Sequence, residues 1–202
     1  MKNLIALCAA AAFLGACSER AADEEPPEGS GPPDASAPAT SGSETSASAS
    51  MSSDQGAAVQ LSPTQGNTAS GMLSVTSDGS MVRLTGRLQG LKPDAEFGFH
   101  IHEKGDCSAP DASSAGGHFN PTNAQHGNPQ GDAHHGGDML NAKSDAQGVA
   151  EVDAQASGVS LRTGQPDDVL GKAVVLHEKA DDYATQPSGD SGGRIACGVI
   201  TG

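Results

Sequence analysis

Short segments in which apolar and polar residues alternate are the feature that most constrains the fold of this chain. Alternation with a period of two is typical of a strand with one buried face, and Gly, Asp, Ser or Pro between such segments is typical of turns. No window keeps a helical period of apolar residues. About eight or nine short strands of this kind predict an all-β sandwich or barrel. We expect them at residues 57–61, 72–75, 81–88, 96–102, 139–143, 148–153, 158–161, 172–177 and 194–200.

Two long segments, 103–138 and 178–193, lack this alternation and are rich in Gly, Pro, Asn, Asp and Ser. Loops of this length in a small domain are usually either functional or disordered. The first segment contains four histidines and one cysteine. We therefore expect it to be an ordered loop that is held by metal and by a disulfide.

All seven histidines lie between residues 100 and 177, which points to metal binding. His100 and His102 alternate with Phe99 and Ile101, so the two imidazoles share one strand face and look outward while the apolar pair enters the core. His177 ends another apolar strand and can supply a third nitrogen. An all-imidazole site suits Cu(II).

A second group of candidate ligands consists of His118, His126, His135 and Asp138. Three imidazoles and one carboxylate satisfy tetrahedral Zn(II) without a thiolate. A lone histidine at any of these positions would more often be an ordinary surface residue. The whole set therefore carries the prediction of two metal sites.

The N-terminus predicts export. A positive start is followed by an apolar stretch at 4–14, about half the 20 or so apolar residues that a membrane-spanning helix needs. Residues 1–16 are therefore predicted to be a signal peptide. Their ending, LGAC at 14–17, resembles a bacterial lipobox, in which Cys17 becomes the lipidated first residue. Because Ser18 follows instead of an aspartate, we expect a periplasmic protein anchored to the outer membrane of a Gram-negative bacterium. An ordinary signal peptide cleaved elsewhere is the alternative.

The amino-acid composition divides the part of the chain after the signal peptide into a tether and a domain. Residues 17–56 contain eight acidic residues, one basic residue and almost no large apolar residue, which predicts a disordered tether. Residues 57–202 have the length of one domain. With a net charge of −14 for the chain and 2% aromatic residues, neither a basic patch nor a stacking surface is expected. Nucleic acid is therefore excluded as a partner.

Cysteine usage agrees with export. Cys8 leaves with the signal peptide and Cys17 is used for lipid, so Cys107 and Cys197 remain in the domain. An exported domain with one such pair is expected to oxidise it to a disulfide.

Four segments of the domain resemble the signature segments of the copper/zinc superoxide dismutases. The resemblance extends from about residue 57 to the C-terminus. The segments are GFHIHEKGDC at 98–107, SAGGHFNP at 114–121, HEKADD at 177–182 and GGRIACGVI at 192–200.

The resemblance implies an eight-stranded antiparallel Greek-key β-barrel with two long functional loops. It also implies one Cu²⁺/Cu⁺ and one Zn²⁺ per subunit, bridged by a doubly coordinated His118. The implied copper ligands are His100, His102, His118 and His177, and the implied zinc ligands are His118, His126, His135 and Asp138.

Further roles also follow from the resemblance. Asp181 corresponds to an outer carboxylate that accepts hydrogen bonds from His100 and His126, and Arg194 to the arginine that attracts superoxide at the copper channel. His118 would bridge the metals and carry a proton. The spacing of the ligands makes His135 the zinc ligand and leaves His134 as a solvated neighbour.

The implied function is dismutation of superoxide to oxygen and hydrogen peroxide in the cell envelope. The resemblance does not decide between a monomer and a homodimer. Two alternatives remain: a periplasmic metal-storage protein without turnover and a zinc-only structural domain. The presence of Arg194 disfavours the first, and the copper histidines would be unnecessary in the second.

Overall fold

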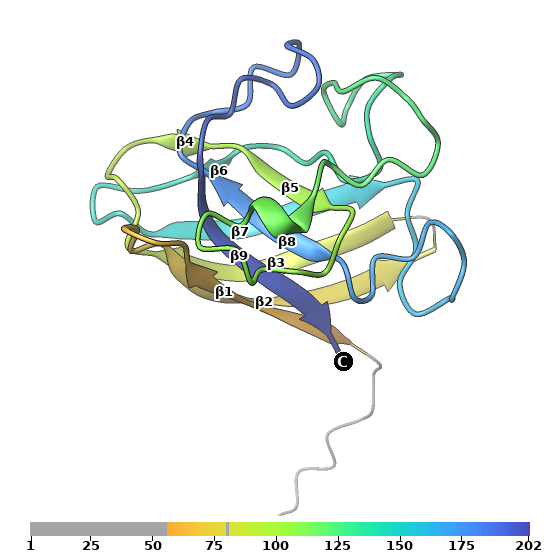
Figure 1. Cartoon of the computed structure of the whole chain (residues 1–202), viewed down its shortest axis with the longest axis horizontal. Helices are drawn as coiled ribbons and strands as arrows, with labels where there is room; N and C mark the ends of the chain where they lie inside the picture. Colours follow the sequence, from red (N-terminus) through yellow and green to blue (C-terminus); the bar gives the residue numbers. More distant parts are fainter. Residues whose placement is uncertain (1–55, 80) are drawn as a thin grey trace, which may run out of the picture. The chain divides into compact units, whose positions relative to one another are not determined.

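The computed structural model describes residues 56–79 and 81–202 (Figure 1). The predicted signal peptide, Cys17 and the acidic tether up to residue 55 lie outside the described residues, and their predictions stay predictions. Among the described residues, no helix has the length and apolar character needed to cross a membrane.

The described part of the chain is built from strands, which confirms the all-β prediction. It contains one 3-10 turn, η1 (Ser113–Ala115). The strands are β1 (Ala57–Pro63), β2 (Ser70–Asp78), β3 (Met81–Gln89), β4 (Glu96–Phe97), β5 (Phe99–His102), β6 (Ala142–Lys143), β7 (Ala150–Ser157), β8 (Ala173–His177) and β9 (Arg194–Thr201).

Seven strands form an antiparallel sheet in the order β5-β8-β9-β1-β2-β3-β7, and β4 pairs with β6. Because β4 continues into β5 through Gly98 and β6 lies beside β7, the sheet curls toward a closed barrel. Counting β4 and β5 as one interrupted strand gives the predicted eight. The chain passes from β3, near one edge of the sheet, to β5 at the other, as a Greek-key connection requires.

Two expected strands differ from the prediction. Residues 158–161 form no strand: β7 ends at Ser157, and Gly158 has a φ of +69°, which turns the chain away. Ser160 then makes an isolated bridge to Asp168. The segment expected at 139–143 is a strand only over Ala142–Lys143, because Asp138 bridges back to His100 on β5.

The core lies between the curled faces of the sheet. Strand β7 shows the predicted alternation, with every second side chain buried. Each large apolar side chain buried in this way contributes about 1.5–3 kcal/mol. The largest fully buried apolar residues are Phe99, Leu61, Leu73, Leu84, Leu88, Ile101, Met139, Leu176 and Ile200.

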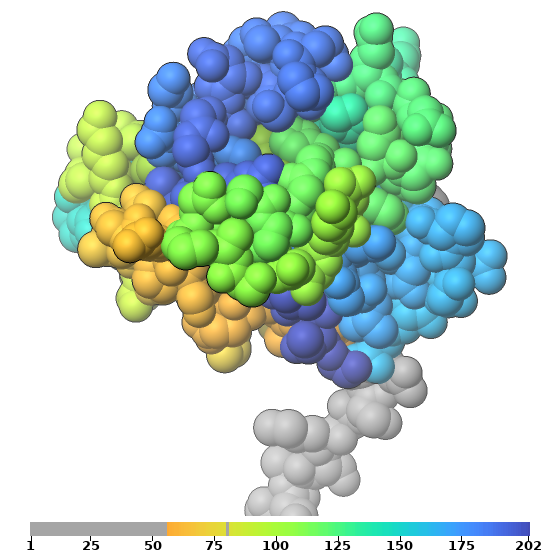
Figure 2. Space-filling model, in the orientation of Figure 1, coloured from red at the N-terminus to blue at the C-terminus, as the bar shows by residue number. Residues whose placement is uncertain are grey.

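Strand β8 is buried on both faces. Val174 and Leu176 point into the main core, whereas Ala173 and Val175 pack in a second cluster with Ala112, Ala115 and Cys197. The segment 107–117, which contains η1, therefore covers the outside of the barrel at β8 (Figure 1). Segments 118–138 and 178–193 project together beyond the barrel, and Figure 2 shows a hollow between 178–193 and the loop that contains η1.

Candidate metal centre

His100 and His102 lie on β5 with exposed fractions of 0% and 1%. Phe99 and Ile101 alternate with them and enter the main core, as the strand period requires. The imidazoles face outward from the barrel core, as expected, but they are shielded from solvent. The reason is that the long loop returns over β5, with His100 bridged to Asp138 and His102 bridged to His118.

Four imidazoles converge on one point outside β5 and β8. They belong to His100, His102, His118 and His177, and one nitrogen from each lies within 4.8 Å of the others. The Nε2 atoms of His102 and His177 are 3.4 Å apart. All four residues are buried. We call this group the four-histidine cluster.

A second group adjoins the first through His118. It consists of His118, His126, His135 and Asp138, again with one ligand atom from each within 4.8 Å of the others. The Nδ1 atoms of the three histidines lie 2.8, 3.0 and 3.4 Å from the Asp138 carboxylate oxygens. We call this group the Asp138 cluster.

Several ring nitrogens in these clusters are buried and have no hydrogen-bond partner. They are His100 Nδ1, His118 Nε2, His126 Nδ1 and His135 Nδ1. A buried polar atom without a partner costs about 1–3 kcal/mol, and bound cations would satisfy all four. For example, His126 Nδ1 lies 3.0 Å from Asp138 Oδ2 but does not have the geometry of a hydrogen bond to it. Two ligands of one ion are expected to approach each other in this manner.

The opposite ring nitrogens of the ligands are held by the protein. His102 Nδ1 donates to the carbonyl of Gly116 at 2.9 Å, and His177 Nδ1 to that of Gly192 at 3.2 Å. Such partners fix the tautomer and direct the free nitrogen toward the cluster. The sequence reasoning missed both glycine carbonyls, because backbone acceptors leave no side-chain signal.

Asp181 connects the two clusters. Its Oδ2 accepts from His100 Nε2 at 2.7 Å and its Oδ1 from His126 Nε2 at 3.0 Å. Asn141, which the sequence reasoning also missed, fixes the Asp181 backbone through its side-chain amide at 2.9 and 3.0 Å. Gly189 leaves the space for Asp181, since a Cβ there would lie 1.8 Å from Asp181 Oδ1.

Burial and the neighbouring charges shift the pKa values of the candidate ligands in the metal-free protein. Burial lowers the pKa of His118 to about 4 and that of His177 to about 3, so both rings are neutral at pH 7. Burial also acts to lower the pKa of His126, but the nearby Asp138 and Asp181 carboxylates outweigh it and raise the pKa to about 9, so this ring is protonated at pH 7. Burial would raise the pKa of Asp138, yet the hydrogen bond from His118 and the nearby rings of His126 and His135 hold it well below its usual range. Asp138 is thus an ionised carboxylate that can bind a divalent cation, and His126 must release its proton when it becomes a ligand.

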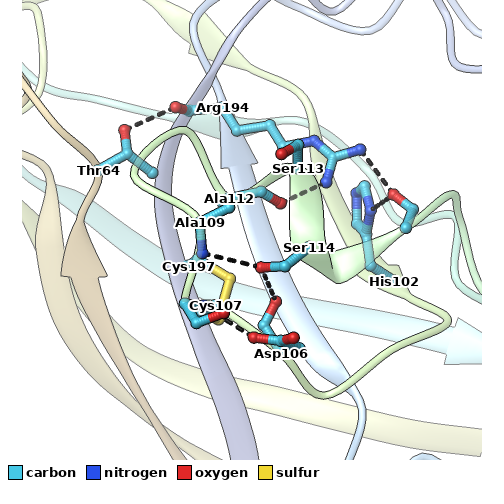
Figure 3. Close-up of a disulfide and its surroundings, with 12 residues drawn as sticks. Thr64, His102, Asp106, Cys107, Ala109, Ala112, Ser113, Ser114, Arg194 and Cys197 are labelled. Atoms are coloured by element: carbon cyan, nitrogen blue, oxygen red, sulfur yellow. Dashed lines mark hydrogen bonds between the residues drawn. A yellow bond between two sulfur atoms is a disulfide. The ribbon is translucent and has the colours of Figure 1, made fainter.

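Arg194, the first residue of β9, is held near His102 of the four-histidine cluster (Figure 3). Its Nη1 donates to the carbonyl of Ala112 and its Nη2 to that of Gly116, each at 2.6 Å. Gly116 also accepts from His102 Nδ1. The Cys107–Cys197 disulfide, predicted from the cysteine count, ties the loop that bears these carbonyls to β9.

His134 lies outside both clusters. Its Nδ1 donates to the carbonyl of His135 at 2.7 Å, and its Nε2 lies 3.1 Å from Ser157 Oγ on β7. It is therefore not a freely solvated neighbour, as the sequence suggested, but a link between the loop and the barrel.

Comparison with known proteins gives a consistent result. The family model described as copper/zinc superoxide dismutase (SODC) matches residues 69–200. "Superoxide dismutase [Cu-Zn] 2" of Aquifex aeolicus is 42% identical over 159 residues, which cover 76% of this chain and 91% of that protein. The "Superoxide dismutase-like protein YojM" of Bacillus subtilis is 50% identical over 117 residues, covering 55% of this chain and only 59% of the relative.

Solved structures agree in fold. A crystal structure of a SOD-like protein from Bacillus subtilis has a TM-score of 0.63 at 43% identity, and covers 71% of this chain and 97% of the other. The crystal structure of the clock protein EA4 has a TM-score of 0.64 at 40% identity, and covers 72% and 93% of the two chains.

Proposed function

Because this chain belongs to the copper/zinc superoxide dismutase family, we propose that it converts superoxide to oxygen and hydrogen peroxide at a histidine-bridged copper–zinc site. The observation that carries the proposal is the position of His118. Its Nδ1 faces the Asp138 cluster, and its Nε2 is buried without a partner in the four-histidine cluster.

The donor sets assign the metals. The four-histidine cluster suits copper, whereas three imidazoles with the Asp138 carboxylate suit zinc. When bound, copper supplies one-electron oxidation and reduction, while zinc supplies charge and order without changing its oxidation state.

The residues of the chain supply the remaining chemistry. The guanidinium of Arg194 attracts and orients a small anion beside the four-histidine cluster, since its position is fixed by two carbonyls. His118 Nε2 can hold the proton that a peroxide product needs. Asp181 keeps His100 and His126 in the tautomers that present Nδ1 to the metals.

The activity test uses the purified protein loaded with copper and zinc, and measures superoxide removal. We expect His118→Ala to remove nearly all activity, and Arg194→Ala to lower the rate about tenfold or more by removing the local positive field. His134→Ala is the matched histidine control and should retain activity. Full activity in His118→Ala would refute the bridged mechanism. An inactive wild-type protein that still binds both metals would instead indicate metal storage.

The proposed location is the cell envelope, with Cys17 as a lipid anchor. The support is the signal-peptide pattern at residues 1–16 and the Cys107–Cys197 disulfide, a bond typical of oxidising compartments. Mass spectrometry of protein purified from membranes should find lipid on Cys17, and Cys17→Ser should move the protein to the soluble fraction. An unchanged membrane fraction in Cys17→Ser would contradict the anchor.

A further inference from the structure

One side chain, Gln186, holds the whole backbone of His126. The Gln186 Oε1 accepts from the His126 N–H at 3.0 Å, and the Gln186 Nε2 donates to the His126 carbonyl at 2.8 Å. Among the described residues, these two backbone groups have no other hydrogen-bond partner. We call this pair of hydrogen bonds the Gln186 clamp.

The loop that carries Gln186 also holds the ring of His126. Asp181 Oδ1 lies 3.0 Å from His126 Nε2, so segment 178–193 contacts His126 at its backbone nitrogen, its backbone oxygen and one ring nitrogen. The remaining ring nitrogen, Nδ1, faces Asp138 Oδ2 at 3.0 Å. With the backbone and one ring atom fixed, the direction of Nδ1 is fixed as well.

The neighbouring residues are held differently. Ala124 is bound by the Asn120 side chain within its own loop, and Gly127 N–H donates to Asp138 Oδ2. Segment 178–193 therefore holds segment 103–138 through its hydrogen bonds to His126. Because its backbone and one ring nitrogen are both held, a backbone shift of less than about an ångström would change the direction of His126 Nδ1.

We propose that Gln186 is a positioning residue for the Asp138 cluster, which sets the direction of His126 Nδ1 and thereby slows the release of the metal. This inference rests on the zinc site proposed above. Gln186 itself is exposed, so water can replace its amide without unfolding the barrel. The effect of losing the clamp should therefore appear in metal binding rather than in folding.

The experiment measures Co²⁺ at the zinc site of the full-length protein, loaded first with Cu⁺ under anaerobic conditions. Cu⁺ has no d–d absorption, so the visible spectrum reports the geometry of the Co²⁺ ligands. Gln186→Met keeps the length of the side chain and removes both hydrogen-bonding groups, and Gln186→Ala removes the side chain. Gln130→Met is the matched control, because Gln130 is an exposed glutamine of the first loop whose side chain makes no hydrogen bond among the described residues.

We expect both Gln186 variants to release Co²⁺ to a chelator about five- to tenfold faster than wild type, with altered d–d bands, because partners behind a ligand commonly change metal affinity by about ten- to a hundredfold. Gln130→Met should match wild type, and the urea midpoints of the metal-free proteins should agree. Unchanged release and spectra in Gln186→Met would overturn the role of Gln186 while leaving the zinc site in place. A change in Gln186→Ala alone would also overturn it, because packing would then be the cause. Failure of the wild type to bind Co²⁺ would refute the zinc site itself.

Discussion

Opening the Cys107–Cys197 disulfide should destabilise the metal-free protein by about 4–5 kcal/mol. The two cysteines are 90 residues apart, and the chain-entropy relation for a loop of this length gives that value at 25 °C. With a urea slope of about 2 kcal/mol per molar, the unfolding midpoint should fall by about 2 M. The metal-free protein is used because bound metal stabilises the native state by mass action and would hide part of the loss.

The assay compares urea unfolding of the wild-type protein with and without a thiol reductant, and of the double variant Cys107→Ser, Cys197→Ser. Cys197 is 4% exposed and packs among alanines and Val175, so a serine hydroxyl there adds a cost of about 1 kcal/mol. The reduced wild type should therefore lie slightly above the double variant, and reductant should not affect the double variant. A fall of less than about 0.5 M in the reduced wild type would refute the estimate, whose basis is loop entropy.

Three further predictions concern the candidate metal ligands and the residues around them. Asp181→Asn should weaken zinc binding about ten- to a hundredfold, as measured by chelator competition, because a neutral amide cannot accept from both His100 and His126; equal affinity would contradict the proposed role. Gly189→Ala should lower the free energy of unfolding by about 2 kcal/mol or more in urea, since φ is +70° and the new Cβ would lie 1.8 Å from Asp181 Oδ1; an unchanged midpoint would refute this. The metal-free protein should lose stability as the pH falls from 6.5 to 4, because burial lowers the pKa of His118 to about 4. In this range the unfolded chain binds more protons than the folded protein, which favours unfolding. Equal urea midpoints at pH 6.5 and 4.5 would contradict this prediction.

The ligands that lie on strands of the barrel could be predicted from the sequence pattern. A period of two places His100 and His102 on one face of a strand, and the structure brings them together with His177 from the paired strand β8. The period identifies a face but not what covers that face. Segments 103–138 and 178–193 cover this face. Because they lack a regular alternation of apolar and polar residues, the burial of the histidines could not be predicted.

Partners of the ligands were predictable only where a motif named them. Asp181 was found through the resemblance, and the structure places it between His100 and His126. The carbonyls of Gly116 and Gly192 and the amide of Gln186 depend on how the loops fold back. The missed turn at Gly158 has a similar cause, because a positive φ interrupts a segment whose apolar pattern still resembles a strand.

The carbonyl of Gly116 connects a candidate copper ligand to the arginine that is proposed to attract superoxide. It accepts from His102, a ligand of the proposed copper site, and from Arg194, the group that would attract superoxide. Neither side chain can move relative to this oxygen without losing a hydrogen bond, so one backbone atom relates the positions of His102 and Arg194. Gly116 has a φ of +75°, and a Cβ there would lie 2.4 Å from Glu103 Oε1, so the loop can present this oxygen only with glycine at the position. The disulfide at Cys107 holds the same loop against β9, from which Arg194 extends. A bond that stabilises the fold therefore also holds the loop whose carbonyl positions both His102 and Arg194.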